Sequence, residues 1–193
     1  MQHIGHKASP GNYSFNLKWV EQQASAQADL LPNPRYPIAA ETYAEYDRLM
    51  GDMEKELHQM HQLVNTTNAQ REQLEQLLAS VPAEEKYKNL HTQGDALVKK
   101  MKAWDEDMVQ RKSKAYDDVE NFPNKFTANY IFLINQTESD IPRVNQPSLD
   151  LKWALDSEWA TLKARMETIE TTDMPAMNKM LWDAGIGGIW KRF

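Results

Sequence analysis

The sequence predicts a mainly α-helical fold: a long antiparallel helical hairpin within an up-and-down helical bundle, preceded by a small N-terminal β-hairpin. Two long stretches, one from residue 40 and one from residue 87, carry apolar residues spaced alternately three and four apart. This spacing places the apolar side chains on one face of a helix. Because the break between the two stretches is short and contains proline, the two helices must lie side by side and antiparallel.

The first element expected is the β-hairpin. Large apolar residues occupy every second position from Tyr13 to Trp19, which is typical of a half-buried strand, and a weaker strand follows as far as Leu31. Two strands alone are only marginally stable in water, so we expect this pair to pack on the helices or to join a larger sheet. With the proline-rich linker that follows, the hairpin makes up residues 1–37, and residues 38–193 form the helical bundle.

The two long helices are predicted from their apolar seams. The first seam consists of Tyr43, Tyr46, Met50, Met53, Leu57, Met60, Val64, Thr67, Arg71, Leu74, Leu78 and Val81. Pro82 and the acidic residues after it mark the start of the second helix. The second seam consists of Tyr87, Leu90, Gly94, Leu97, Met101, Trp104, Met108, Arg111, Ala115, Val119 and Phe122. The second helix is therefore expected to continue as far as Asn121.

Shorter helices follow. Residues 125–138 read as a helix, residues 139–147 as a loop, and Ser148 as the N-cap of a further helix. The apolar face of that helix is predicted to carry Leu151, Leu155, Trp159, Leu162, Met166 and Ile169. Asp173 is expected to cap a last helix that Gly185 closes, and the apolar residues 186–190 are expected to dock on the bundle.

Composition narrows the classes of partner. The 193 residues carry a formal net charge of -6, which offers no basic face for nucleic acid. The strongest apolar run, residues 130–134, is far shorter than the roughly 20 residues that cross a bilayer, so no membrane span is expected. Residues 1–10 lack the apolar stretch of a signal peptide, and the absence of cysteine leaves the compartment open.

Few residue patterns suggest chemistry. His58 and His61, with Glu54 upstream, share a helix face, but their spacing does not match the Glu-x-x-His pairs of di-iron bundles, and surface histidines are the better interpretation. No catalytic residue, cofactor site or metal site is therefore predicted. Thr67 and Arg71 interrupt the first seam, and Gly94 the second; they form either a polar layer that fixes the register of the helical pair or a solvent-facing gap.

The tryptophans divide into two groups. Trp153, Trp159 and Trp182 lie on helical patterns, which favours core packing. Trp19 and Trp190 do not, so together with Arg71 they are the residues we expect on an interaction surface.

The chain also resembles a known family. Pro10, Gly11, Tyr13, Phe15 and Leu17, followed by Asn33, Pro34 and Arg35 and by residues 126–186, resemble the C-terminal region of bacterial BNR-repeat, sortilin-like "glycosyl hydrolase" proteins. In that family a β-propeller precedes an immunoglobulin-like segment that ends in a hairpin of this kind. The propeller is missing here, so the resemblance carries over no catalytic residue. It implies an accessory or assembly domain.

We therefore expect a non-catalytic structural or interaction domain that binds a protein partner or a second copy of itself. One alternative is a carbohydrate-binding accessory domain, which the tryptophans and the resemblance suggest. A second alternative is a metal-dependent enzyme that uses His58 and His61.

Overall fold

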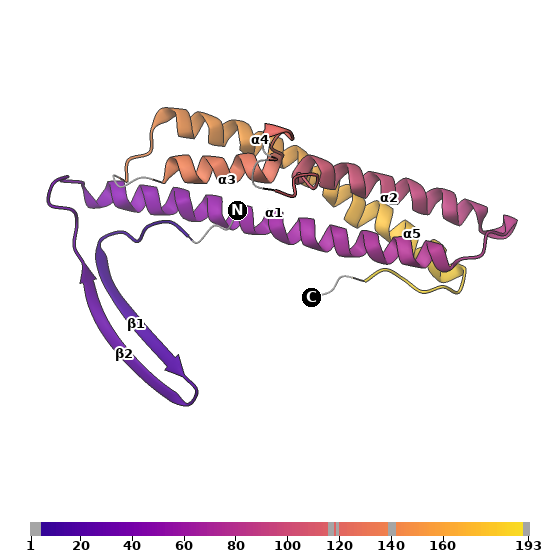
Figure 1. Ribbon diagram of the computed structural model, residues 1–193, viewed down its shortest axis with the longest axis horizontal. Coiled ribbons are helices and arrows are strands. Elements are labelled where there is room, and N and C mark those ends of the chain that lie inside the picture. The colour runs from indigo at the N-terminus through magenta and orange to yellow at the C-terminus, as the bar shows by residue number, and fades with distance from the viewer. Residues whose placement is uncertain (1–4, 116–117, 119, 139–141, 191–193) are drawn as a thin grey trace.

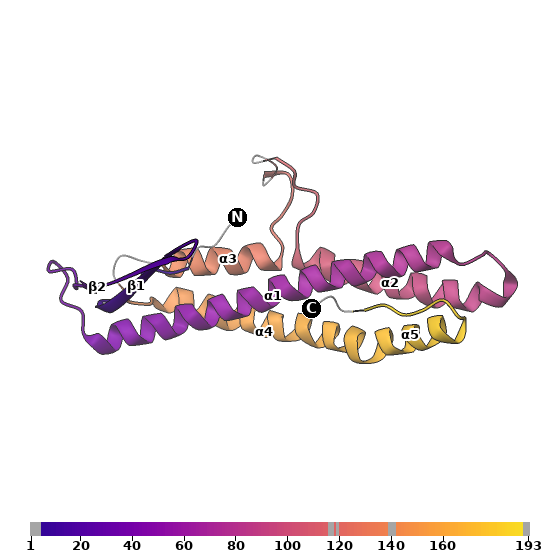
Figure 2. The ribbon, with the colours of Figure 1, turned by 90° about the horizontal axis from the view of Figure 1, so that it is seen from below.

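The computed structural model describes residues 5–115, 118, 120–138 and 142–190, and it confirms the mainly α-helical fold. The helices form an elongated bundle (Figures 1 and 2), and the N-terminal hairpin projects from it (Figure 1). Helix α1 (Ala40–Ser80) runs the length of the bundle, and the other helices pack along it. None of the helices in the described ranges is long and apolar enough to span a membrane.

Helices α1 and α2 form the predicted antiparallel hairpin. After α1 the chain turns at Val81 and Pro82, passes through a single 3-10 turn, η1 (Glu85–Tyr87), and enters α2 (Lys88–Met108). The Pro82 carbonyl accepts a hydrogen bond of 2.9 Å from the Glu84 N–H, which closes the turn. The reversal near Pro82 is confirmed.

The two predicted seams are largely buried, and together with α3, α4 and α5 they form one hydrophobic core. The buried residues of α1 are Tyr46, Met50, Met53, Leu57, Met60, Val64, Thr67, Gln70, Leu74 and Leu78. The buried residues of α2 are Leu90, Gly94, Leu97, Val98, Met101, Trp104, Asp105 and Met108. The prediction is wrong at one step of α1, where Gln70 is buried and Arg71 lies at the edge of the seam. Either residue satisfies a spacing of three or four, and packing against the other helices selects Gln70.

Helix α2 ends at Met108, well before the predicted end at Asn121. Val109 adopts an extended conformation (φ −136°, ψ 134°), and the side chain of Arg111 turns back to bind the carboxylate of Asp105. Beyond Met108, helix α3 (Phe126–Thr137) takes the place of α2 along α1 (Figure 1). The remaining members of the predicted second seam therefore lie in the connection between α2 and α3, except Val119, which is outside the described residues.

Helix α4 (Gln146–Thr168) begins earlier than predicted. Its N-cap is Asn145, whose side-chain oxygen accepts a 2.9 Å hydrogen bond from the Ser148 N–H. Ser148 is thus the donor in this cap rather than the capping residue. The predicted apolar face is buried except for Leu151, and Trp159 stacks on Phe126 with ring centroids 5.9 Å apart.

No break separates α4 from the last helix. A π-helical turn, η3 (Ile169–Asp173), joins α4 to α5 (Met174–Asp183), and Asp173 itself has helical angles, so the predicted cap at Asp173 is wrong. The wider turn precedes Pro175, which has no N–H to donate to the helix ladder. Helix α5 ends as predicted at Gly185 (φ +74°), where the Ile186 N–H reaches back to the Leu181 carbonyl at 3.0 Å.

The hairpin consists of β1 (Gly11–Trp19) and β2 (Gln22–Leu30), paired antiparallel as a two-stranded sheet. Val20 has a positive φ of 53° in the two-residue turn between them. The strands are confirmed, but the expected half-burial is not. Nearly every residue of both strands is exposed, because in the described structure neither strand packs on a helix (Figure 1).

Candidate functional site

The segment before β1 ties the hairpin to α1. The His6 N–H donates to Glu54 Oε1 at 2.8 Å, and the His6 ring lies between Glu54, at 2.9 Å, and Asp47, at 3.5 Å. Ser9 Oγ donates to Asp47 at 2.7 Å, and the Tyr13 hydroxyl donates to the Ser9 carbonyl at 2.5 Å. The end of the hairpin that lies next to this segment is therefore fixed to the bundle, and the rest of the hairpin projects.

The register of the hairpin sorts its residues onto two unlike faces. In an antiparallel ribbon, residues directly opposite each other share a face. One face carries Gly11, Tyr13, Phe15, Leu17 and Trp19 from β1 opposite Leu30, Ala28, Ala26, Ala24 and Gln22 from β2. The other carries Asn12, Ser14, Asn16 and Lys18 opposite Asp29, Gln27, Ser25 and Gln23. The first face is thus apolar and uncharged, and the second is polar.

The apolar face of the hairpin is uncovered. Phe15 and Leu17 are each more than half exposed, and Trp19 is 73% exposed. The polar face, by contrast, forms hydrogen bonds across its own strands, including Asn12 to Asp29 at 2.9 Å. Contiguous exposed apolar residues mark interaction sites, and an unpaired strand edge is a template for further pairing. The hairpin therefore offers an apolar face and two open edges to a partner.

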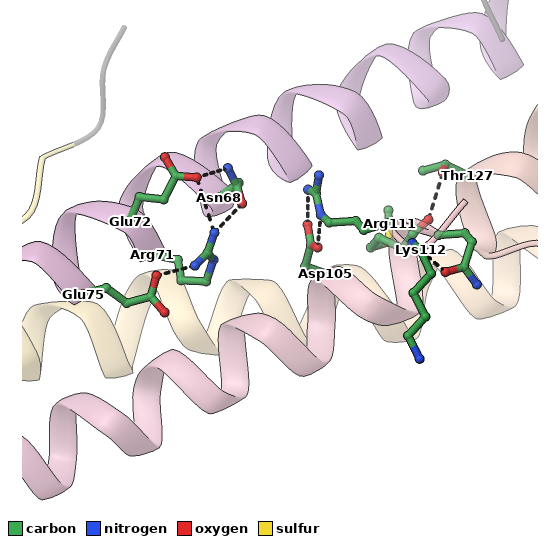
Figure 3. A network of polar contacts seen from close by, with 10 residues as sticks. Asn68, Arg71, Glu72, Glu75, Asp105, Arg111, Lys112 and Thr127 are labelled. Atoms are coloured by element: carbon green, nitrogen blue, oxygen red, sulfur yellow. Dashed lines mark hydrogen bonds and ion pairs between the residues drawn. The ribbon is translucent and has the colours of Figure 1, made fainter. Parts of the chain in front are cut away.

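Arg71, the second residue predicted on an interaction surface, binds carboxylates of its own chain (Figure 3). Its guanidinium pairs with Glu75 and donates to Asn68 Oδ1 at 2.8 Å, while Glu75 also binds Lys102 at 2.7 Å. A hollow of about 440 Å³ lies beside this network. The Arg71 guanidinium is thus paired with side chains of its own helix.

The residues of the predicted polar layer have different neighbours. Arg71 lines the same hollow as Asp105 of α2, which accepts from Arg111 Nη2 at 2.6 Å (Figure 3). The buried hydroxyl of Thr67 instead donates to Met166 Sδ of α4 at 3.4 Å. Gly94 is not part of this layer: a Cβ there would lie 2.6 Å from a methyl group of Leu78, so this glycine permits close packing instead. The burial of Asp105 was not predicted from the sequence, because Asp105 stands in a run of acidic residues that is typical of a solvent-exposed helix face.

The tryptophans do not divide as predicted. Trp159 is buried, but Trp153 and Trp182 are exposed, so the expectation of core packing is wrong for these two. Trp153 lies on α4 and Trp182 on α5, and the described residues leave most of each side chain uncovered. Trp190 is exposed, as expected. It belongs to the C-terminal segment, apart from Trp19 on the hairpin, so the structure does not bring the three predicted surface residues together.

The histidine pair forms no larger cluster. Within the described ranges, no three His, Asp or Glu side chains are arranged to hold a metal ion. Partial desolvation, and then the nearby His58, lower the pKa of His61 below its ordinary value. The buried hydroxyl of Tyr130 donates to Glu56; its burial, and then that carboxylate, raise the pKa of Tyr130. This hydrogen bond joins α3 to α1.

The comparisons with known proteins found nothing similar: no family model matches the chain, and neither the curated proteins nor the solved structures contain a significant match.

Proposed function

We propose that this chain is a non-catalytic interaction domain whose N-terminal hairpin packs its apolar face on a β-sheet of a protein partner. The observation that carries the proposal is the ribbon in which every large apolar side chain lies on one uncovered, uncharged face. A ribbon of nine residues per strand is about 30 Å long. A sheet with an apolar face of that length would cover it.

The energetics favour a partner. Covering a large apolar side chain stabilises a complex by about 1.5–3 kcal/mol before the costs of association. Phe15, Leu17 and Trp19 together therefore offer several kcal/mol, which the isolated chain does not use. Sheets pack face to face through side chains that alternate along each strand, and β1 has this alternation.

The family resemblance suggests where such a sheet comes from. In BNR-repeat, sortilin-like proteins a hairpin of this kind ends an immunoglobulin-like segment, so we propose that the chain is an accessory or assembly domain from the C-terminus of such a protein. The helical bundle then holds the hairpin rigidly through the contacts of His6 and Ser9 with α1. Any glycan-processing chemistry in such proteins would belong to the propeller.

The experiment is a complementation assay. The acceptor is an immunoglobulin-like segment of a BNR-repeat protein, shortened so that it lacks its own final hairpin. We expect the chain to bind this acceptor in calorimetry, and we expect Phe15→Ser with Trp19→Ser to abolish binding. The matched control is Asn16→Ser with Gln27→Ser on the polar face, which should bind normally.

Self-association is the rival version of the same proposal. Sedimentation velocity over a concentration series separates the two, because the dimer version requires a concentration-dependent increase in mass that the Phe15→Ser, Trp19→Ser variant lacks. If the chain remains monomeric and does not bind the shortened acceptor, the hairpin is not an interaction element and the proposal fails. Equal loss of binding in the apolar-face and polar-face variants would also reject it.

A further inference from the structure

The hydrogen-bonding pattern of the hairpin determines which of its backbone groups are unpaired. Strand β1 ends at Trp19 and β2 begins at Gln22, so the turn between them has two residues. The residues on either side of such a turn form a hydrogen-bonded pair, and such pairs alternate with non-hydrogen-bonded pairs along the ladder. Trp19 belongs to the apolar face, so the residues of that face direct their N–H and C=O groups at the other strand. The residues of the polar face direct theirs outward, to the two edges of the hairpin.

The side chains of the polar face agree with this pattern. In a non-hydrogen-bonded pair the two residues lie closer together than in a hydrogen-bonded pair, so that short side chains can meet. Asn12 donates to Asp29 at 2.9 Å, Ser25 donates to Asn16 at 2.6 Å, and the residues of each bond are directly opposite each other. On the open edge of β1 the outward N–H and C=O groups therefore belong to polar-face residues such as Ser14.

The edges of the hairpin have few of the features that prevent pairing with a further strand. Natural edge strands are kept short, bulged or covered, or they carry proline and charged residues. Here both strands have nine residues, pair without a bulge and contain no proline, and each has one charged residue, Lys18 in β1 and Asp29 in β2. Among the elements of the described structure, β1 and β2 contact only each other (Figure 1). Their outward backbone groups are thus available to another strand, which presents donors and acceptors at the same spacing.

The compositions of the two strands indicate which edge is used. From β1 the apolar face takes three aromatic residues and Leu17, whereas from β2 it takes three alanines, Gln22 and Leu30. Aromatic residues are enriched in strands and alanine is depleted, and neighbours on adjacent strands stabilise a large side chain. In the hairpin the large side chains of β1 have a neighbouring strand on one side only, and Phe15 and Leu17 are more than half exposed. Strand β1 therefore has the composition of an inner strand, and β2 that of an edge strand.

We infer that the open edge of β1 pairs with an edge strand of the partner, so that β1 becomes an inner strand and β2 the new edge. This inference rests on the proposed function, in which the apolar face of the hairpin packs on a sheet of the partner. A strand paired with β1 lies beside the hairpin and leaves that face open, so the partner supplies two sheets, one that the hairpin extends and one that covers its apolar face. The paired strand should have large apolar side chains beside Phe15 and Leu17, and uncharged or acidic side chains beside Lys18.

Hydrogen exchange of the full chain labelled with ¹⁵N tests the pairing without any substitution. The probe is the shortened immunoglobulin-like segment of the complementation assay. We expect exchange of the Ser14 and Lys18 amides to slow by about tenfold or more when this acceptor is added, because their outward N–H groups become hydrogen-bonded. The amides of Ser25 and Gln27, on the opposite edge, should exchange as before. Protection of the Ser14 amide without the acceptor, increasing with protein concentration, would assign the edge to a second copy of the chain and overturn the inference.

A matched pair of proline substitutions separates the two edges. Ser14 and Gln27 are directly opposite each other, and both direct their N–H groups outward. Ser14→Pro and Gln27→Pro therefore each remove one edge donor and leave the ladder between the strands intact. In calorimetry Ser14→Pro should weaken binding of the acceptor by about tenfold or more, and Gln27→Pro should not weaken it. Slow exchange of the Phe15 amide, which points at β2, verifies that the hairpin persists in both variants.

The outcomes separate this inference from the proposed function. If Ser14→Pro binds as tightly as the unchanged chain while Phe15→Ser with Trp19→Ser does not bind, the face contact stands and the edge pairing is overturned. Equal loss of binding in the two proline variants would reject the assignment to β1. If the unchanged chain does not bind the acceptor, the proposed function and the edge pairing both fail.

Discussion

The stability of the bundle should depend strongly on the indole N–H of Trp104. This residue is 0% exposed, and its Nε1 donates a 2.8 Å hydrogen bond to the Leu162 carbonyl, joining α2 to α4. Trp104→Phe keeps an aromatic ring but removes this donor. The lost buried hydrogen bond costs about 1 kcal/mol. The unfilled volume adds about 1–2 kcal/mol.

The expected total is about 2–3 kcal/mol, which corresponds to a fall of about 5–10 °C in Tm for a chain of this length. Thermal and urea unfolding followed by circular dichroism at 222 nm measures it. Trp153→Phe is the matched control: Trp153 is 78% exposed, so the same substitution should change stability by less than about 0.5 kcal/mol. Equal effects of the two substitutions would refute the assignment of Trp104 to the core and Trp153 to the surface.

Three further predictions concern the helices and their connections. Gly51→Ala should stabilise the fold by about 0.5–1 kcal/mol because a Cβ there meets nothing within 4 Å. Gly94→Ala should bring no such gain in stability, since its Cβ would lie 2.6 Å from a methyl group of Leu78. Thermal unfolding compares the two variants, and equal gains would contradict the close packing of α2 on α1 at Gly94. Asn145→Ala should lower stability by about 1 kcal/mol through loss of the cap of α4, and an unchanged urea midpoint would disprove that cap. The carboxylate of Asp118 accepts hydrogen bonds from two backbone N–H groups, which lower the pKa of Asp118. The stability that these bonds contribute is present above the ordinary pKa of 3.8 and is lost as the pH falls through the lowered pKa. An NMR titration of Asp118 with a midpoint at or above 3.8 would reject this prediction.

Much of the bundle could be predicted from the sequence because a helical face is a local property. The apolar spacing along α1 identified Met53, Met60 and Leu74 as core residues, and all three are fully buried. The antiparallel partner followed from the short break at Pro82, since the connection leaves no room for any other arrangement.

The ends of elements were harder to predict. The spacing of the second seam continues beyond Met108 through Arg111 and Ala115, and nothing in that pattern marks a stop. Helix α2 ends at Met108 because α3 packs against the next section of α1 and the side chain of Arg111 turns back to Asp105. Both are tertiary contacts, and the spacing of apolar residues along one helix carries no information about them.

The candidate surfaces show the same difference between what local periodicity predicts and what tertiary contacts decide. The alternation in β1 indicated an apolar face, and the helical spacing of Trp182 indicated a core position, yet both are exposed. The sequence by itself determined which residues form helices and strands and which faces are apolar, because those follow from backbone periodicity and side-chain chemistry. Only the tertiary structure decided which of those faces is covered, because burial depends on whether another element of the chain lies against the face.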